Sequence, residues 1–411
     1  MSRPSRVRTV ALLGTGQTLA WASSFYLPAM LAAPMARDLG VAMPTVFAAF
    51  SVALVVSAVF GPGVGRTIDR HGGRPVLMAT NGLFALGLVA LAMVQGPISL
   101  FLAWALIGVA MGSGLYEAAF ATLVRLYGSA SRDPITGITL IAGFASTVGW
   151  PLTTLLDAQF GWRGACLAWA ALHLVVGLPL NALLPRATDP APHDAPLPMA
   201  GASPDGATAP AATGTDRPVL VSAVLAFVFA ATWFVSTAMA AHLPRLLQAT
   251  GATLAVAVGV GALVGPAQVA GRLLEFGVLR RVHPLLSARL AALGHPLGAA
   301  ALWVAGAPLA IPFALLHGAG NGMLTIAKGT LPLVLFGPQG YGARQGWLMM
   351  PARVSQALAP FAFGLVLDRW GAHALWLSGA LGLGAFAALM LLPKPRPVAP
   401  AVTASPGHPS P

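Results

Sequence analysis

The sequence predicts an all-α integral membrane protein, with twelve transmembrane helices arranged as two pseudo-symmetric six-helix bundles. Three observations predict this class: the composition, the number of long apolar blocks, and a repeat that relates the two halves. Of 411 residues, 57% are apolar and only 8% are charged. Soluble chains carry about 25% charged residues, so this chain has too few to cover a soluble surface. The same figures exclude disorder for most of the chain.

Twelve apolar blocks are long enough to cross a bilayer, which takes about 20 residues. The blocks of the first half are residues 10–32, 45–64, 76–94, 100–123, 135–156 and 165–184. The blocks of the second half are residues 219–241, 254–278, 285–304, 309–335, 347–367 and 374–392. Six blocks, a break and six more blocks therefore predict two bundles, at residues 1–185 and 218–393.

The segment between the halves has a different composition. Residues 186–217 combine six prolines with Ala, Thr and Asp and show no apolar period. Such a composition is typical of a flexible tether, and we expect a cytoplasmic linker there. Residues 394–411 have a similar composition and are predicted to be a disordered cytoplasmic tail.

The distribution of basic residues predicts the orientation. With the N-terminus inside, seventeen of the 23 Lys and Arg residues fall on the cytoplasmic side. Only Arg37, Arg163, Arg245 and Arg369 lie outside, and Lys328 and Arg353 lie within apolar blocks. Because cytoplasmic loops collect Lys and Arg, we expect both termini in the cytoplasm and a multi-pass protein of a bacterial inner membrane.

The net charge of +12 does not indicate a nucleic-acid partner, because the basic residues lie in short loops between apolar blocks. The single cysteine, Cys166, excludes a disulfide framework. His173, His295 and His317 stand singly on apolar blocks without an i, i+4 metal pair. No metal and no cofactor are predicted.

Three pairs of short segments relate the two halves. Gly112 and Gly114 align with Gly320 and Gly322 at an offset of 208 residues. After the second block stands Gly65-Arg66-x-x-Asp69, and after the eighth stands Gly271-Arg272-x-x-Glu275. The fifth and eleventh blocks end in Leu156-Asp157 and Leu367-Asp368. Three pairs in one order at nearly one spacing indicate a duplication.

The loop after the second block, residues 65–74, reads GRTIDRHGGR. It resembles the G-x-x-x-D-[RK]-x-G-[RK]-[RK] loop of the major facilitator superfamily of secondary transporters. Gly73 departs from it, since the family usually has a basic residue there. The resemblance covers about residues 7–393 and implies alternating access, with a cavity lined by the first, fourth, seventh and tenth helices.

The loop also predicts a cytoplasmic gate on physical grounds. Gly65 lets another helix approach closely, because it has no Cβ. Asp69 can pair with neighbouring arginines or with the N-terminus of an opposing helix. The alternative is a basic loop that only enforces topology. The expected gate comprises Gly65, Asp69, Arg70, Gly72 and Arg74, with Gly271, Arg272 and Glu275 as counterpart and Arg125 and Arg353 as possible partners. For Arg353 we expect pairing with Asp69 or Glu275, and the alternative is that it reaches a substrate.

Two ionisable residues lie deep in apolar blocks. Glu117 and Lys328 are each about 12 Å from the cytoplasmic ends of their helices, at 1.5 Å per residue. Such residues are functional candidates because charge is costly in a membrane. The resemblance places them across the pathway from each other, where protonation of Glu117 would release Lys328 to bind an anion. Alternatively, Lys328 extends to the interface along its apolar stem.

Polar residues on the first apolar block complete the candidate binding site. Gln17, Trp21 and Ser24 have the spacing i, i+4, i+7, which predicts one polar helix face. Thr325 is the counterpart of Glu117 at the offset of 208. Ordinary hydrogen bonding between helices is the alternative for each of these residues.

The sequence therefore predicts a secondary transporter that moves a small organic anion such as a carboxylate, coupled to protons. The alternative is proton-driven efflux of drugs or amphipathic compounds. A membrane enzyme or scaffold is less expected, because no phosphate-binding loop, nucleophile elbow or zinc-protease pattern occurs. The expected partners are a small-molecule substrate, a proton and the lipid bilayer, and we expect a functional monomer.

Overall fold

The computed structural model describes residues 6–186 and 217–392. The helices of the first half are α1 (Arg6–Ser23), α2 (Leu27–Leu39), α3 (Met43–His71), α4 (Gly73–Ala92), α5 (Pro97–Gly114), α6 (Tyr116–Tyr127), α7 (Arg132–Ala142), α8 (Ala145–Leu172) and α9 (Leu178–Ala182). Those of the second half are α10 (Pro218–Ala249), α11 (Leu254–Gly277), α12 (Pro284–Ala305), α13 (Ala310–Phe336), α14 (Tyr341–Trp370) and α15 (Ala374–Met390). Most of the linker and tail predicted at 186–217 and 394–411 lies outside the described residues.

Nine helical stretches in the described ranges are long and apolar enough to cross a membrane, and two of them are too long to cross once. Pro97–Ala182 has 86 residues, which would extend about 130 Å as one helix, against a hydrocarbon core of about 30 Å. It turns back after Tyr127 and again at Gly161. Tyr341–Met390 likewise turns at Gly371. Counted by these turns, the chain accommodates the twelve predicted crossings.

Gly161 turns the chain between the two halves of α8. Its φ of +70° lies in a region that residues with a Cβ seldom adopt, which explains the glycine. The next two residues tie this turn to α2: the indole of Trp162 donates to Asp38 at 3.2 Å, and Arg163 forms an ion pair with the same carboxylate. The sequence Gly161-Trp162-Arg163 thus forms a corner at the end of the bundle opposite the N-terminus.

The helices extend beyond the predicted apolar blocks, because a helix continues through polar residues that leave the hydrocarbon. The eleventh block was expected at 347–367, whereas α14 spans Tyr341–Trp370. The first block is divided rather than continuous: α1 ends at Ser23 and α2 begins at Leu27, with Pro28 in its first turn. Proline is favoured in a first turn, where its missing N–H costs nothing.

The duplication is visible in how glycines pack between helices, and this packing changes the alignment of the two halves from the one predicted. Gly108 and Gly112 of α5 pack on the backbone of Ala53 and Ser57 in α3. Gly318 and Gly322 of α13 pack in the same way on Val264 and Gln268 in α11. Gly112 therefore corresponds to Gly322, not to Gly320, and the offset in these helices is 210 residues. With this register Lys328 is the counterpart of Ala118, next to Glu117.

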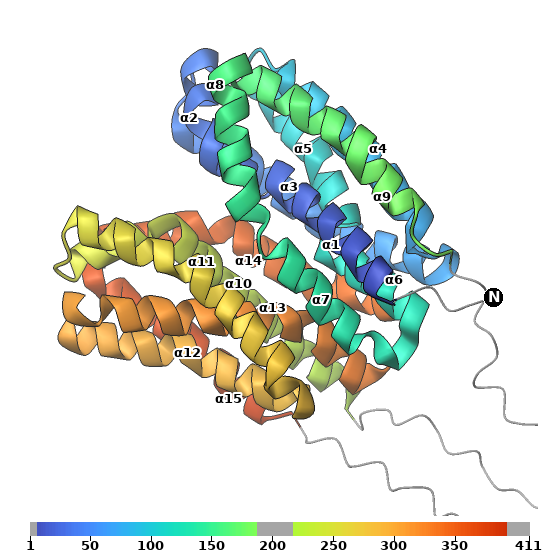
Figure 1. Cartoon of the computed structure of the whole chain (residues 1–411). Helices are drawn as coiled ribbons and strands as arrows, with labels where there is room; N and C mark the ends of the chain where they lie inside the picture. The colour runs from blue at the N-terminus through green and yellow to red at the C-terminus, as the bar shows by residue number, and fades with distance from the viewer. Residues whose placement is uncertain (1–5, 187–216, 393–411) are drawn as a thin grey trace, which may run out of the picture.

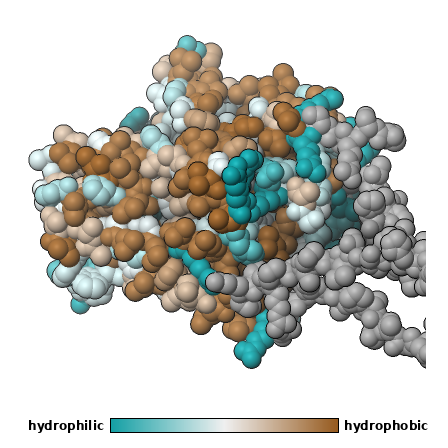
Figure 2. All heavy atoms as spheres, turned by 60° about the horizontal axis from the view of Figure 1, so that its bottom comes forward, coloured by the Kyte–Doolittle hydropathy of each residue, from teal (hydrophilic) through white to brown (hydrophobic). Residues whose placement is uncertain are grey.

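The two bundles come together at the end where α1 begins and diverge toward the opposite end (Figure 1). Their shared surfaces are α3 with α14, α6 with α14, and α7 with α11 and α13. Apolar side chains cover much of the outer surface of the molecule (Figure 2). Leu102 on α5, Val304 on α12 and Phe361 on α14 are each about two-thirds exposed or more, as expected of residues that face acyl chains.

Candidate functional site: a charged centre between two bundles

The α3–α14 contact is closest where α3 ends. A Cβ on Gly65 would overlap the backbone carbonyl of Gly342, and a Cβ on Gly342 would lie 2.5 Å from the Gly65 carbonyl oxygen. Asp69 accepts hydrogen bonds from the backbone N–H groups of Gly342 and Ala343, at 2.8 and 2.9 Å. The Asp69 carboxylate thus caps the N-terminus of α14, where the helix dipole favours negative charge.

The sequence allowed Asp69 to pair either with neighbouring arginines or with the N-terminus of an opposing helix, and the structure distinguishes the two. Asp69 contacts the opposing helix N-terminus, and within the described chain it forms no ion pair with Arg66, Arg70 or Arg74. Gly72 ends α3 with a φ of +80°. Gly73, where a basic residue is usual in the resembling family, lies against Thr122 of α6 so closely that a Cβ would overlap its hydroxyl. Close packing on α6 therefore explains the departure.

The second half supplies an equivalent contact. Glu275 at the end of α11 forms an ion pair with Arg132, the first residue of α7, at 3.2 Å. Arg132 also donates to the carbonyls of Leu279 and Val282, and Arg272 donates to the Thr139 carbonyl at 3.2 Å. Each bundle therefore presents an acid to the start of a helix in the other. Arg132 was missed in the sequence, although the repeat relates α7 to α14 and could have indicated it.

Gly271, the third member of the counterpart, has another role. A Cβ on Gly271 would overlap the Ala319 carbonyl of α13, so its close contact lies within its own bundle. Arg125 forms no ion pair with a described residue, and its Nε atom is buried without a hydrogen-bond partner there. Arg125 therefore makes no gate contact with a described residue.

Glu117 lies between the bundles and is paired with an unexpected residue. Nη2 of Arg353 on α14 donates to both carboxylate oxygens of Glu117, at 2.9 and 3.0 Å. The expected pairing of Glu117 with Lys328 is thus wrong in this structure, as is that of Arg353 with Asp69 or Glu275. Arg353 is 4% exposed and also donates to Gln356 at 3.1 Å. Counting residues along the helix predicted how deep Arg353 lies in the membrane. It did not predict in which direction the side chain points, and this direction decides which acid it contacts.

A break in the fourth crossing positions Glu117. The backbone is extended at Leu115, so α5 ends at Gly114 and α6 begins at Tyr116. Glu117 is therefore in the first turn of a helix, where the dipole stabilises a carboxylate. Gln17 of α1 donates to the freed Gly114 carbonyl at 2.6 Å. Gln17 thus supports the break and does not itself contact Glu117 or Lys328.

Lys328 is buried and has no ionic partner among residues 6–186 and 217–392. Its side chain is 4% exposed, and Nζ has no hydrogen-bond partner among the described residues. Nζ lies 4.1 Å from the ring centroid of Trp233 on α10, a cation–π distance. Trp233 stacks on Trp21 of α1, with ring centroids 6.4 Å apart and planes 7° apart. The guanidinium of Arg353 lies 5.7 and 6.0 Å from the same two rings.

The structure therefore brings Trp21, Glu117, Lys328 and Arg353 to one place between the bundles, together with Trp233 of α10. Ser24 donates to Ala20 and Thr325 to Asn321, each a carbonyl of its own helix. Those two bonds are local, so they are neither contacts of a binding face nor the bonds between helices that were the alternative.

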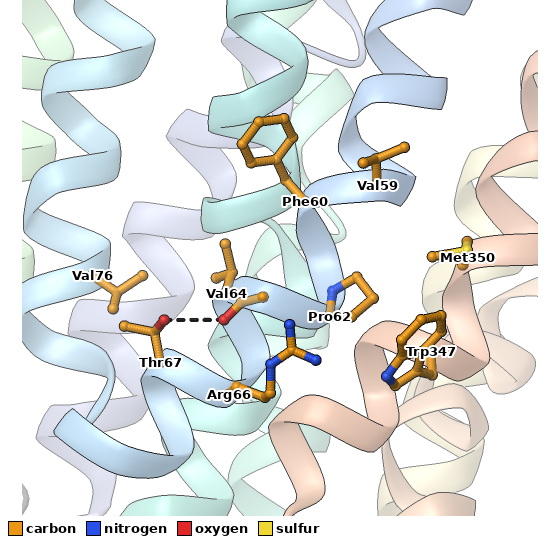
Figure 3. A pocket seen from close by; sticks show the side chains of 10 residues that line it. Val59, Phe60, Pro62, Val64, Arg66, Thr67, Val76, Trp347 and Met350 are labelled. Carbon is orange, nitrogen blue, oxygen red and sulfur yellow. Dashed lines mark hydrogen bonds between the residues drawn. The ribbon is translucent and has the colours of Figure 1, made fainter.

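A separate groove of about 480 Å³ lies beside the gate, on the outer side of the α3–α14 contact. Figure 3 shows Trp347 and Met350 of α14 facing Pro62 and Arg66 of α3. Its walls are largely apolar, and Val59 and Trp347 are 65% and 57% exposed. Its lining includes none of Glu117, Lys328 and Arg353.

Two helical bundles that contact each other at one end, with a buried charged centre between them, define a multi-pass membrane transporter. The sequence profile of the Major Facilitator Superfamily matches residues 13–294, about two-thirds of the chain. The protein belongs to this family, which confirms the resemblance of its gate loop. The family indicates a transporter rather than an enzyme.

Two relatives match along most of their length. An uncharacterized 38 kDa protein in the 23S RNA operon of Thermoproteus tenax is 29% identical over 364 residues, covering 88% of this chain and 89% of the relative. Monocarboxylate transporter 11 of Homo sapiens is 30% identical over 396 residues, covering 88% and 80%. The proton:xylose symporter XylE shares the fold, with a TM-score of 0.71 and 15% identity over 94% of this chain and 95% of that one.

Proposed function

We propose that this protein is a secondary transporter of a small organic anion such as a carboxylate, coupled to protons and working by alternating access. The observation that carries the proposal is Lys328, a buried ammonium group with no ionic partner in the described chain. A buried charge without a counter-ion is costly, and an anionic substrate would remove that cost. The human relative named as a monocarboxylate transporter supports the same class of substrate.

The surroundings of Lys328 suit an anion with a small organic body. Trp233 and Trp21 offer aromatic faces next to the ammonium group. Arg353 lies near the same rings, and its guanidinium can hold a carboxylate through two parallel hydrogen bonds. A substrate carboxylate could therefore contact both cations, Lys328 and Arg353, while the organic body of the substrate packs against the indole rings.

Glu117 supplies the coupling to protons. While it is ionised, Glu117 holds Arg353 and keeps that guanidinium from the substrate. One proton added to Glu117 neutralises the carboxylate, and Arg353 is then free to bind the substrate carboxylate. One proton and one monoanion occupy the site together, so their joint movement carries no net charge. This exchange replaces the Glu117–Lys328 exchange that the sequence predicted.

The gate contacts determine when the site is accessible. Asp69 with α14, and Glu275 with Arg132, join the bundles at the end where α1 begins. With both termini in the cytoplasm, as the basic residues predict, this end is cytoplasmic and the structure represents an outward-facing state. Tilting of the bundles would break these contacts and open the site to the cytoplasm.

Uptake into proteoliposomes tests the proposal. The purified protein is reconstituted, and a panel of radiolabelled mono- and dicarboxylates of two to six carbons is supplied with and without an inside-alkaline pH gradient. We expect saturable uptake of at least one monocarboxylate that increases with the gradient. In Lys328→Met we expect kcat/KM to fall by a factor of about 10 to 100, as for loss of a charged contact of 1.5–3 kcal/mol.

The matched control is Arg280→Met, which removes an exposed cation whose guanidinium lies over the Phe276 ring. It should transport as the unchanged protein does. Normal carboxylate uptake by Lys328→Met would contradict the assigned anion site. Absence of carboxylate uptake, together with altered accumulation of amphipathic dyes in cells, would favour the efflux alternative.

A further inference from the structure

Two histidines expected to stand singly are bonded to each other inside the C-terminal bundle. Nδ1 of His295 on α12 lies 3.0 Å from Nδ1 of His317 on α13, and the two rings are nearly perpendicular. Both side chains are buried, at 7% and 4% exposed. Phe313 stacks on His317 and meets His295 edge to face. The pair is separate from the Glu117–Lys328–Arg353 centre.

A hydrogen bond between two Nδ1 atoms fixes the tautomers of the pair when both rings are neutral. One ring must donate Nδ1–H and the other must accept, so the accepting ring carries its own proton on Nε2. The donating ring then has a free lone pair on Nε2. When His295 donates, that lone pair belongs to its Nε2 atom, which is buried and has no hydrogen-bond partner in the described chain. The pair can therefore accept one more proton without losing its mutual bond.

The pair borders a small cavity of about 20 Å³, which is large enough for one water molecule. Its lining comes from four helices and consists of Thr232, Val235, Ala291, Ala292, His295, His317, Gly320, Asn321, Leu324 and Gly382. Most of this wall is apolar, and the imidazoles and the Asn321 amide are the polar groups that could hold a water molecule there. Such a water molecule would bring a proton to the imidazoles.

Among the described residues, the helices that line the cavity bring no other titratable or charged group to the pair. The lining residues on α10 and α15 are uncharged. On α12 the nearest charge is Arg289, whose guanidinium donates to the Leu389 and Leu392 carbonyls. On α11, Arg272 and Glu275 are bonded to α7. On α13 the nearest charge is Lys328, eleven residues from His317.

A polar face of α13 connects the pair with the charged centre. His317, Asn321 and Thr325 are spaced at i, i+4 and i+8, and Lys328 follows one turn later, about 16 Å from His317 at 1.5 Å per residue. Thr325 donates to the Asn321 carbonyl on this face. On α10, Thr232 of the cavity precedes Trp233, whose ring holds Lys328. The same two helices therefore form both sites.

We propose that the His295–His317 pair is a second proton-binding site, which takes up one proton on an imidazole Nε2 when the anion enters the charged centre. The inference rests on the proposed function, since the anion at Lys328 supplies the negative charge that favours the proton. Uptake adds one proton to the neutral pair and gives one imidazolium that still donates Nδ1–H to its neighbour. His317 is two turns from the start of α13, on the outer side in the proposed orientation, and outer protons reach it first.

Solid-state NMR of the reconstituted protein labelled with ¹⁵N-histidine tests the site without requiring transport. At pH 8.5 we expect a nitrogen–nitrogen coupling across the Nδ1–H···Nδ1 bond, and on lowering the pH to 5.5 the appearance of one imidazolium from the coupled pair. Both the coupling and this imidazolium should be absent in His295→Gln. A coupled pair that remains neutral throughout this pH range would overturn the inference, as would absence of the coupling.

Transport adds a second measurement. In His295→Gln and His317→Gln we expect the pH of half-maximal carboxylate uptake to move by about one unit, equivalent to a tenfold change in proton affinity. The matched control is His173→Gln in the N-terminal bundle, because both ring nitrogens of His173 are already bonded, to Ser23 at 2.7 Å and Asn81 at 2.9 Å. It should leave the pH profile unchanged. An unchanged pH profile in both pair variants would contradict the coupling.

The two proposals can fail separately. If no carboxylate is transported but the NMR titration of the pair is observed, the substrate assignment is wrong and the proton site stands. If carboxylate uptake depends on Lys328 but the pair does not titrate, the proposed function stands and the second proton site is wrong. Thermal unfolding of each variant in detergent verifies that it is folded before either measurement.

Discussion

Arg353 on α14 holds both carboxylate oxygens of Glu117 on α6, at 2.9 and 3.0 Å, and so joins the two bundles at their centre. The pair is largely buried, with side-chain exposures of 4% for Arg353 and 17% for Glu117. Removal of one partner from such a pair leaves the other charge buried and unpaired, whereas neutral substitution of both is often tolerated. The following predictions begin with this pair.

We expect Arg353→Met to lower the free energy of unfolding by about 3–5 kcal/mol, because Glu117 loses its counter-ion. The double variant Arg353→Met/Glu117→Gln should recover part of this loss, with a coupling energy of about 0.5–3 kcal/mol. Denaturant unfolding in detergent at pH 8 measures both. Strictly additive effects would show that the two side chains do not interact in solution.

Gly65→Ala should weaken the contact between α3 and α14, because the new Cβ would overlap the Gly342 carbonyl, which is backbone and cannot rotate away. Spin labels at the adjoining ends of α3 and α14 should then show a longer distance, measured by double electron–electron resonance. The control is Gly63→Ala on the same helix, where the nearest atom to a Cβ is the flexible Arg66 guanidinium at 4.0 Å. Identical distance distributions in the two variants would argue against Gly65 as a gate residue.

Asp69→Asn should shift the bundles away from the closed arrangement, since the amide loses the charge that faces the α14 N-terminus. The loss of a negative charge at a helix N-terminus costs about 0.3–1 kcal/mol, and up to about 2 kcal/mol in a partly buried position. The same spin-label distances and the rate of carboxylate uptake measure the shift. Asp133→Asn is the control, because Asp133 is an exposed acid in the first turn of α7. The gate role is wrong if Asp69→Asn leaves transport and distances unchanged.

His283 makes the loop between α11 and α12 sensitive to pH. Its Nδ1 accepts from the Leu285 N–H at 3.1 Å and caps α12, which requires the neutral ring. Burial, followed by the charges of Arg132 and Arg289, lowers the pKa of His283. The folded form therefore binds this proton more weakly than the unfolded chain, whose histidine pKa is about 6.5. The resulting stabilisation is complete above that pH and is lost as the pH falls toward the folded pKa.

We accordingly expect the thermal stability to decrease between pH 7.5 and 5, with part of the decrease due to His283. His283→Asn keeps a capping acceptor and removes the titrating group, so its stability should depend less on pH over this range. Thermal unfolding scans of both proteins at several pH values provide the comparison. An equal pH dependence in the two proteins would mean that folding does not change the pKa of His283.

Gly73→Ala should destabilise the protein although the position lies at the end of a loop, because the methyl group would overlap Thr122 of α6. Overpacking of this kind costs about 1–3 kcal/mol. Gly82→Ala on the same helix is the control, since no atom lies within 4 Å of its Cβ position. Denaturant unfolding of the two variants measures the difference, and comparable stability would show that α4 and α6 adjust without cost.

Much of the fold could be predicted from the sequence. The apolar blocks located the helices, because the cost of exposing a segment to lipid is a sum over its own residues and needs no knowledge of their neighbours. The gate loop was predictable for a similar reason: a glycine and an acid four residues apart lie on one helix face, and Gly65 and Asp69 do contact the same helix. Their role in transport stays a prediction.

The partners in the candidate site were less predictable. Arg353 was recognised as a buried cation but assigned to the wrong acids, and Arg132, Trp233 and the bonded histidines were not connected with their partners. Depth in the membrane follows from counting residues along one helix. A contact between two helices also requires the rotation of each about its axis, and the break at Leu115 changes that rotation just before Glu117.

By itself the sequence determined the class of protein, the positions of the crossings and the charged residues that had to be buried, because these depend on local composition and spacing. Only the tertiary structure decided that Glu117 bonds to Arg353, that Lys328 lies on the Trp233 ring, and that His295 meets His317. Directional contacts of a few ångströms depend on how the helices rotate and pack against each other. Hydrophobic burial has no direction, and it therefore places the helices without choosing these partners.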